Sequence, residues 1–396
     1  MRSIGSIIAA GVFLSSLALC QGAEEDRFPD FSWDTVPRYM HVRKSTAFTK
    51  EEIQYLATFP LITFEKTTGM KDSGSTEKGT LKAAKAVKQI NPRAKILYYR
   101  NILVHYPMYD ADAALRSIRK AFLADQKGNT KLVRGTVQAY DLSNRAVQSW
   151  WLDNAKKVCS SEYINGLFVD GNIKVLEPDY LAGAVGATKK ASVGQAYNEM
   201  MKKLPEMLGP EKLIVANIIR ARFPRSGLEY MNYFDGSYIE GFEHATGGLS
   251  REEYMAKGIS AVQAEARKGR IIAFTIGMGK DKGDAELGTD EVREQASSWD
   301  AVRQRFVYSL ALYLICAEKY SYFMASDGYG VDSGSNLFWM KSIPEYSYPL
   351  GAPKGSAVKR GYTYIREFEH ASVLIDVQKE QAEIIWEKTG DIKDEF

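Results

Sequence analysis

The chain has 396 residues, of which 45% are hydrophobic and 26% are charged, and this is the composition of an ordinary globular protein. Its 52 basic residues nearly balance its 49 acidic residues, so the net charge of +3 lacks the basic surplus expected of a nucleic-acid-binding protein. The length allows one large domain with a smaller appendage, or two domains of medium size. Nucleic acid is therefore not an expected partner.

The first residues have the pattern of a secretory signal peptide. Arg2 precedes an apolar stretch, Ile7–Leu19, which small or polar residues follow. A charged start, a short apolar core and a small-residue exit predict a signal peptide over residues 1–23. The apolar core is too short to span a bilayer comfortably. We expect an exported protein, periplasmic or extracellular, with no integral membrane segment after signal removal. Lipid anchoring at Cys20 is less favoured, because the preceding Leu19 is large.

The remaining cysteines and the histidines give no sign of a metal centre. Cys159 and Cys316 each sit in an amphipathic helical pattern, which favours buried free thiols. The four histidines are scattered along the chain, so the clustered spacing of a zinc site is missing. We expect neither a metal nor a cofactor.

Short apolar segments alternate with amphipathic helices between residues 30 and 330, and this alternation predicts an α/β fold, a (β/α)8 TIM barrel. The expected strands are Arg38–Arg43, Leu61–Glu65, Lys95–Tyr99, Gly166–Asp170, Leu213–Asn217, Gly236–Glu240, Arg270–Ile276 and Tyr320–Ala325. The expected helices include Lys50–Thr58, Thr80–Ile90, Asp112–Leu123, Arg145–Ser160, Gly194–Leu208, Ser250–Lys268 and Ser298–Ala317. A doubly wound open sheet would instead need a glycine-rich phosphate loop after its first strand, where this chain has Lys44-Ser-Thr.

Residues 331–396 have a different pattern and predict a small β-rich extension. Tyr362–Phe368, Ala371–Val377 and Glu383–Trp386 alternate in the manner of strands, with prolines and glycines before them. We expect an antiparallel element that packs on the barrel.

Two segments seventy positions apart repeat one pattern: Asn165-Gly-Leu-Phe-Val-Asp170-Gly and Asp235-Gly-Ser-Tyr-Ile-Glu240-Gly. Because side chains alternate across a strand, Asp170 and Glu240 are expected to face the barrel interior. Both lie at the C-terminal ends of their strands, where TIM barrels have their active sites. Asp235 begins its strand and belongs at the opposite end of the barrel.

A pair of carboxyl groups at one barrel mouth suits the cleavage of a glycosidic bond. One carboxyl must donate a proton to the leaving oxygen, and the other must be ionised to attack the anomeric carbon or to activate water. We assign Asp170 as nucleophile or base and Glu240 as general acid/base. Glu243 and Glu65 also lie near strand ends, so either is an alternative to Glu240. Stereochemistry, linkage and substrate stay open.

Further polar residues follow the predicted strands and are candidates for contacts with a sugar. The predicted substrate-binding residues are Glu65, Tyr98, Arg100, Asn101, Asn217, Glu243 and Asp327. Tyr99, Arg220 and Tyr329 are expected at the same rim, and His41 at the floor of the site. No Gly-x-Ser-x-Gly elbow of a serine hydrolase occurs. A divalent metal at Asp170 and Glu240 would lack a third ligand at short spacing.

Three segments resemble a known family: Tyr163-Ile-Asn-Gly-Leu-Phe-Val-Asp170-Gly, Tyr348-Pro-Leu-Gly-Ala-Pro-Lys-Gly-Ser-Ala and Tyr364-Ile-Arg-Glu-Phe-Glu-His-Ala-Ser-Val373. They are similar to the hypothetical glycosyl hydrolases among bacterial secreted proteins, and this resemblance implies a TIM barrel with a short C-terminal extension. The Asp of strand four and the Glu of strand six also resemble the pair of barrel α-galactosidases and polygalactosaminidases. That likeness implies Asp170 as nucleophile and Glu240 as acid/base.

Two functions are therefore hypotheses for this chain, beside a purely structural role, which would predict no cleft. The first is hydrolysis of an extracellular poly- or oligosaccharide. The second is a non-catalytic glycan-binding barrel, in which the carboxylates would lie too far apart or be occupied in salt bridges.

Overall fold

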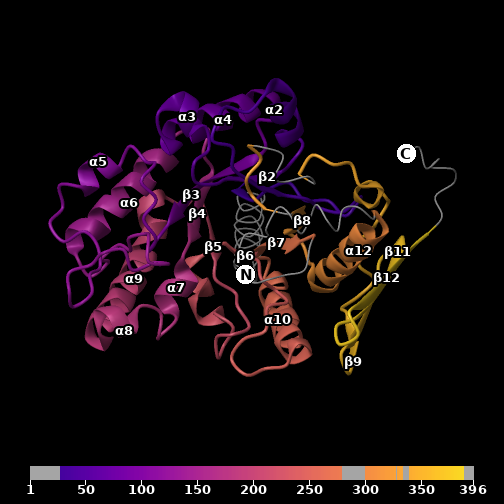
Figure 1. The fold of residues 1–396 in the computed structure, drawn as a ribbon. Helices are drawn as coiled ribbons and strands as arrows, with labels where there is room; N and C mark the ends of the chain where they lie inside the picture. The colour runs from indigo at the N-terminus through magenta and orange to yellow at the C-terminus, as the bar shows by residue number, and fades with distance from the viewer. Residues whose placement is uncertain (1–26, 279–298, 327, 333–338, 388–396) are drawn as a thin grey trace, which may run out of the picture.

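The computed structural model describes residues 27–278, 299–326, 328–332 and 339–387. The predicted signal peptide and Asp327 lie outside these residues. Eight parallel strands pair in chain order, from β1 to β8, as Figure 1 shows. The strands are β1 Met40–Val42, β2 Leu61–Phe64, β3 Lys95–Asn101, β4 Gly166–Asp170, β5 Leu213–Asn217, β6 Gly236–Ile239, β7 Ile271–Gly277 and β8 Ser321–Ser326.

The last strand returns to the first, which closes the barrel. A parallel bridge pairs Phe323 of β8 with Arg38, just before β1, and the Phe323 amide donates to the Pro37 carbonyl over 2.8 Å. Beyond the strands, the Arg43 amide donates to the Tyr329 carbonyl over 2.8 Å. The predicted (β/α)8 barrel is confirmed.

Helices surround the strands (Figure 1). They are α2 Lys50–Leu56, α3 Met70–Ser73, α4 Thr76–Ile90, α5 Asp112–Leu115, α6 Arg145–Cys159, α7 Asn172–Leu176, α8 Ala182–Val185, α9 Ala187–Leu208, α10 Arg251–Ala266 and α12 Trp299–Cys316, with the 3-10 turns η1 Leu228–Tyr233 and η2 Pro344–Tyr346. None of the helices in the described part of the chain has both the length and the apolar character needed to cross a membrane.

One predicted helix is wrong over most of its length. Only the first turn of Asp112–Leu123 is helical, as α5. Lys120 has a left-handed backbone with φ of 55°, which ends helical geometry. Phe122 then pairs with Tyr140 in an antiparallel bridge. The long excursion between β3 and α6 thus covers the barrel mainly with loop.

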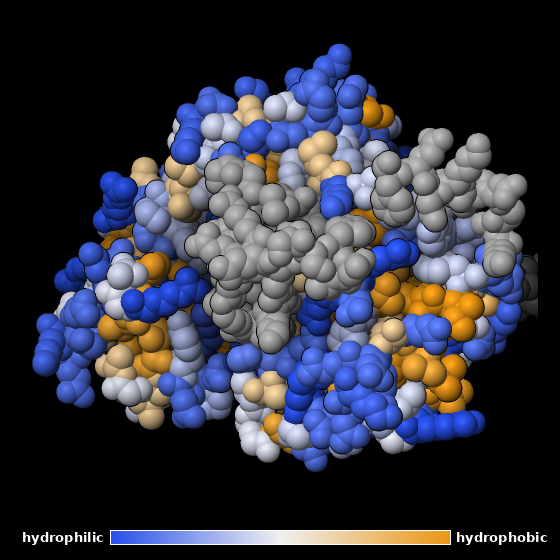
Figure 2. Space-filling view, turned by 45° about the vertical axis from the view of Figure 1, so that its right-hand side comes forward, coloured by the Kyte–Doolittle hydropathy of each residue, from blue (hydrophilic) through white to orange (hydrophobic). Residues whose placement is uncertain are grey.

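The predicted C-terminal element is a four-stranded antiparallel sheet of β9 Val358–Arg360, β10 Thr363–Glu367, β11 Ala371–Asp376 and β12 Gln381–Trp386. It packs on α12 through its last three strands (Figure 1). Buried Arg366 fixes this contact, because its guanidinium donates to the carbonyls of Leu314 and Ala317 at the end of α12 and pairs with Glu318 at 3.0 Å. The outer face keeps exposed apolar side chains, including Leu374 and Val358, on a surface that is otherwise mostly hydrophilic (Figure 2).

Both predicted free thiols are confirmed. Cys159 and Cys316 are free and buried in the helix layer. Burial raises the pKa of each thiol to about 12, so both stay protonated and inert at neutral pH.

Aromatic rings fill the interior of the barrel below its C-terminal mouth. The His41 ring lies 4.8 Å from Phe168, 5.1 Å from Tyr238 and 4.8 Å from Tyr329, measured between ring centroids. Burial, together with the positive charge of Lys66, lowers the pKa of His41 to about 3. A neutral imidazole therefore belongs to this apolar layer.

Close packing against the next strand requires glycine at the first glycine position of each repeated segment. A methyl group on Gly166 would lie 2.1 Å from the Leu213 carbonyl oxygen, and one on Gly236 would lie 2.2 Å from that of Ile271. Backbone of the next strand therefore occupies the space that any side chain would need.

We expect Gly166→Ala to lower the free energy of unfolding by about 1–3 kcal/mol, because the clash is with backbone that cannot swing aside. Urea denaturation of the purified variant would measure this. Gly194→Ala is the matched control, since nothing lies within 4 Å of the added methyl on α9 and the change should be neutral or slightly stabilising. Equal stability of Gly166→Ala and wild type would contradict the prediction.

A second prediction concerns His41 and acid stability. The unfolded chain takes up a proton at this ring below about pH 6.5, whereas the folded chain does not until about pH 3. Between these limits the free energy of unfolding of wild type should fall, relative to His41→Phe, by about 1.4 kcal/mol for each unit of falling pH. Denaturation curves at several pH values would test this, with His370→Phe, which removes an exposed ring, as control. Parallel pH profiles of wild type and His41→Phe would overturn it.

Candidate active site

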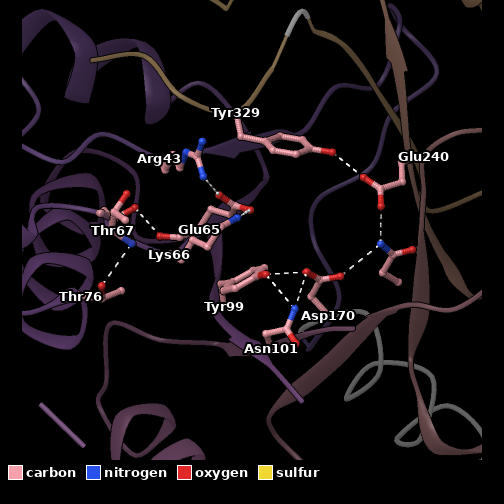
Figure 3. Close-up of polar contacts among 12 residues, drawn as sticks. Arg43, Glu65, Lys66, Thr67, Thr76, Tyr99, Asn101, Asp170, Glu240 and Tyr329 are labelled. Atoms are coloured by element: carbon pink, nitrogen blue, oxygen red, sulfur yellow. Dashed lines mark hydrogen bonds and ion pairs between the residues drawn. The ribbon is translucent and has the colours of Figure 1, made fainter. Parts of the chain in front are cut away.

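A cavity of about 810 Å³ opens at the C-terminal ends of the barrel strands. Its lining includes Glu65 after β2, Asn101 at the end of β3, Asp170 at the end of β4, Asn217 at the end of β5 and Glu240 after β6. Five of the residues predicted as catalytic or substrate-binding, together with Tyr329 of the expected rim, thus share one cavity. Figure 3 shows dashed lines from the carboxylates of Asp170 and Glu240 that meet at one amide group between them.

Asp170 accepts hydrogen bonds from two side chains of the neighbouring strand β3. The Tyr99 hydroxyl lies 2.5 Å and the Asn101 amide nitrogen 3.0 Å from its Oδ2. Burial alone would raise the pKa of Asp170, but the Tyr99 hydrogen bond and the charges of Lys66 and Lys174 hold it below its usual value. The group is therefore an ionised carboxylate at neutral pH.

Gly171 makes this arrangement possible. It follows Asp170 with φ of 80°, and a methyl group on it would lie 2.4 Å from Oδ1 of Asn101. Only glycine accommodates both the left-handed backbone and the close approach of Asn101. Gly241 likewise has a φ of 55° directly after Glu240, so a glycine with left-handed backbone follows each of the two acids.

Glu240 accepts hydrogen bonds from three side chains. Its Oε1 accepts from Asn217 over 2.6 Å and from the Arg220 guanidinium over 3.0 Å, and its Oε2 accepts from the Tyr329 hydroxyl over 2.5 Å. The Tyr238 hydroxyl lies 2.6 Å from that of Tyr329. The Glu240 side chain is 24% exposed, so solvent reaches it.

One amide group joins the two acids. Nδ2 of Asn217 lies 3.3 Å from Oδ1 of Asp170 and 2.6 Å from Oε1 of Glu240 (Figure 3). These two distances add to 5.9 Å, so the two carboxylate oxygens cannot lie farther apart than that.

Glu65 lies across the cavity from Glu240 and has partners of its own (Figure 3). Its carboxylate pairs with Lys66 at 2.5 Å and with Arg43 at 3.5 Å. Burial raises the pKa of Glu65, while the two cations act against this rise. The Lys66 ammonium also lies over the rings of Tyr99 and Tyr106, 5.3 Å and 5.1 Å from their centroids.

Two predicted substrate-binding residues do not reach the cavity. Tyr98 and Arg100 alternate with Tyr99 and Asn101 on β3, so they point to the helix layer. The Tyr98 hydroxyl donates to Asn154 of α6 over 3.2 Å. The Arg100 guanidinium is buried 4.4 Å from the ring centroid of Tyr109. Their assignment to the rim is wrong.

Glu243 is also misplaced as a site residue. It is buried, and its two carboxylate oxygens pair with Arg251 and Arg305 rather than lining the cavity. Asp327 lies outside the described residues. Asp235 is confirmed at the opposite end of the barrel, where it pairs with Arg27 at 2.7 Å and accepts from the Ile214 amide.

Several cavity residues were not predicted from the sequence. Arg43 lies two residues after His41, so the alternation of side chains along a strand would have placed it on the same face, at the mouth. Lys66 directly follows Glu65. The others lie in loops or short helices without periodicity: Tyr106, Arg134, Lys174 and Tyr180.

The donor set around the two acids consists of hydroxyl, amide and cationic groups. No group of three His, Cys, Asp or Glu side chains that could hold a metal ion occurs among the residues whose positions are described. Two carboxyl groups held among such donors are suited to proton transfer and to nucleophilic attack.

Solved structures with a similar fold include several glycosidases. The chain is 12% identical to the alpha-amylase of Geobacillus thermoleovorans, solved with acarbose, with a TM-score of 0.50 over 87% of each chain. An Anoxybacillus alpha-amylase is 10% identical, with a TM-score of 0.48 over 87% of each chain. A GH36 alpha-galactosidase of Geobacillus stearothermophilus is 9% identical, with a TM-score of 0.45 over 89% of this chain and 49% of the other.

At such low identity, the first of these similarities shows a shared fold. No curated protein matches the sequence. A family model does match, over residues 88–372, which include β3 to β8, both repeated segments and the first two strands of the C-terminal sheet. The chain therefore belongs to Hypothetical glycosyl hydrolase family 15.

Proposed function

We propose that the protein hydrolyses glycosidic bonds in an extracellular poly- or oligosaccharide, with Asp170 as nucleophile and Glu240 as general acid/base. The observation that carries this proposal is the shared Asn217 amide, which holds both carboxylates at one cavity. The volume of about 810 Å³ lies within the range of about 300–1,000 Å³ typical of small-ligand sites. Membership of a glycosyl hydrolase family supports the same reaction class.

The surroundings of Asp170 suit a nucleophile. A carboxylate attacks carbon only in its ionised form, and the lowered pKa keeps Asp170 in that form. Tyr99, Asn101 and Asn217 donate to the carboxylate and so orient it at the cavity. Burial raises the pKa of Tyr99 well above its usual value, as does the charge of Asp170, so the phenol remains a donor.

The surroundings of Glu240 suit a group that gives up and regains a proton. Its partial exposure allows exchange with water. Arg220 and Asn217 stabilise the carboxylate that remains after the proton has left. Tyr329 fixes the second oxygen and thereby the direction in which Glu240 faces.

The reaction then has two steps. Asp170 attacks the anomeric carbon while protonated Glu240 gives its proton to the leaving glycosidic oxygen, so that one C–O bond breaks and an ester to Asp170 forms. Ionised Glu240 next removes a proton from water, which attacks the anomeric carbon and releases Asp170. The enzyme ends as it began, with Glu240 protonated and Asp170 ionised.

The ion pair of Glu240 with Arg220 favours a second candidate, a non-catalytic glycan-binding barrel, because a paired carboxylate is less available as an acid. That candidate also predicts widely separated carboxylates, and the limit of 5.9 Å speaks against this part of it. Binding of a glycan without release of reducing ends would favour it.

Asp170→Asn and Glu240→Gln should each lower kcat by at least about 100-fold on a glycan that the wild type cleaves, because each removes a group that forms or breaks a bond. Screening purified protein against a polysaccharide panel, with reducing ends as readout, supplies the substrate. Azide should partly rescue both variants and give glycosyl azides of opposite anomeric configuration.

Asp179→Asn is the matched control, because this exposed aspartate follows α7 near the same rim and lies outside the cavity lining. It should keep wild-type turnover. Near-normal turnover of both Asp170→Asn and Glu240→Gln, with folding unchanged by circular dichroism, would contradict the assignment of these two residues as catalytic.

The short distance between the acids predicts retention of anomeric configuration. Retaining glycosidases hold their carboxyl groups about 5–5.5 Å apart, whereas inverting enzymes need about 6.5–9.5 Å to admit a water molecule. Proton NMR of the first product, recorded before mutarotation, should show the anomer of the substrate bond. Initial release of the opposite anomer would exclude the covalent role of Asp170.

A further inference from the structure

The cations around the cavity divide into two groups. Arg43 and Lys66 pair with Glu65, and Arg220 pairs with Glu240. Arg134 and Lys174 also line the cavity, but no ion pair joins either of them to an acidic side chain in the described part of the chain. The cavity thus carries two cations that form no ion pair within the described part of the chain.

Arg134 sits at the tip of a tight turn. Val133 and Val137 exchange backbone hydrogen bonds of 2.9 Å and 3.0 Å, and the chain reverses between them. Arg134 has φ of 53° and Gly135 has φ of 71°. Asparagine, aspartate or glycine is the usual first residue of such a turn, and arginine is strained there. The turn therefore holds a long cationic side chain at the cavity wall in a backbone geometry that arginine does not favour.

Lys174 approaches the same space from another element. It lies on α7, four residues after Asp170, and its charge contributes to the lowered pKa of that carboxylate. Tyr106 and Tyr180 line the wall as well, and the charge of Arg134 opposes the rise in pKa that burial causes in both phenols. Two cations and two aromatic rings thus face the cavity beside the carboxylate pair.

We propose that Arg134 and Lys174 form an anion-binding subsite, and that the substrate is an acidic glycan carrying carboxylate or sulfate groups. This inference rests on the proposed function only in taking the cavity as a sugar site. The two unpaired cations would bind the acid group of the sugar, while Tyr106 and Tyr180 would contact its apolar face. A neutral sugar would leave both charges without a partner.

The subsite would also direct the substrate. The ionised Asp170 would repel an acidic sugar that approached in a random orientation. Arg134 and Lys174, which come from a turn and from α7, would bind the acid group and so bring the anomeric carbon to the two carboxyl groups. Charge thereby fixes the orientation as well as the affinity.

Binding in the Asp170→Asn background tests the inference without turnover. Isothermal titration calorimetry would compare polygalacturonate with its methyl ester, and dextran sulfate with dextran. We expect preference for the charged member of at least one pair, and at least about a tenfold loss of that affinity in Arg134→Ala/Lys174→Ala. The preferred pair identifies carboxylate or sulfate. The preference should shrink as salt rises from about 0.1 M to about 1 M, where the Debye length falls from ~10 Å to ~3 Å.

Lys127→Ala/Lys131→Ala is the matched control, since it removes two exposed lysines from the same loop region outside the cavity lining. It should retain the preference, as should Arg134→Lys, which keeps the charge. Equal affinity for charged and neutral members in the starting protein, or an equal loss in the two double variants, would overturn the inference. The wild type could also show no turnover of any glycan while the charge preference still depends on Arg134 and Lys174. That result would support the anion-binding subsite and contradict only the hydrolase proposal.

Discussion

The geometry of the cavity depends on holding two carboxylates against one amide nitrogen. The two carboxyl groups, with oxygens no more than 5.9 Å apart, repel each other whenever both are ionised, so the pair needs surrounding donors. Asn217 serves both acids, Tyr99 and Asn101 serve Asp170, and Arg220 and Tyr329 serve Glu240. These groups come from different strand ends, so only the closed barrel brings them together.

The register of the strands explains how the donors and the two carboxyl groups come to lie side by side. Asn101 pairs with Asp170 across β3 and β4, and Asn217 pairs with Tyr238 across β5 and β6. In paired parallel strands, residues that face the barrel interior lie next to each other at the same rim. The glycines then remove the obstacles: Gly166 and Gly236 admit the neighbouring backbone, and Gly171 admits Asn101. The repeated pattern of the two segments is thus a packing requirement as well as a chemical one.

Residues whose positions depend on strand alternation could be predicted from the sequence. Strand alternation placed Asp170 and Glu240 at one mouth, the end of a predicted strand placed Asn217 there, and the structure brings their side chains together. The same rule, applied to β3, excludes Tyr98 and Arg100, because adjacent strand residues cannot both face inward. The prediction that these two residues lie at the rim ignored that constraint.

Loops set the remainder of the site, and no periodicity describes them. Arg134 reaches the cavity from a turn inside the excursion between β3 and α6, where a full helix was predicted over Asp112–Leu123. A positive φ at Lys120 and a bridge at Phe122 depend on contacts distant in sequence, so local propensity cannot reveal them.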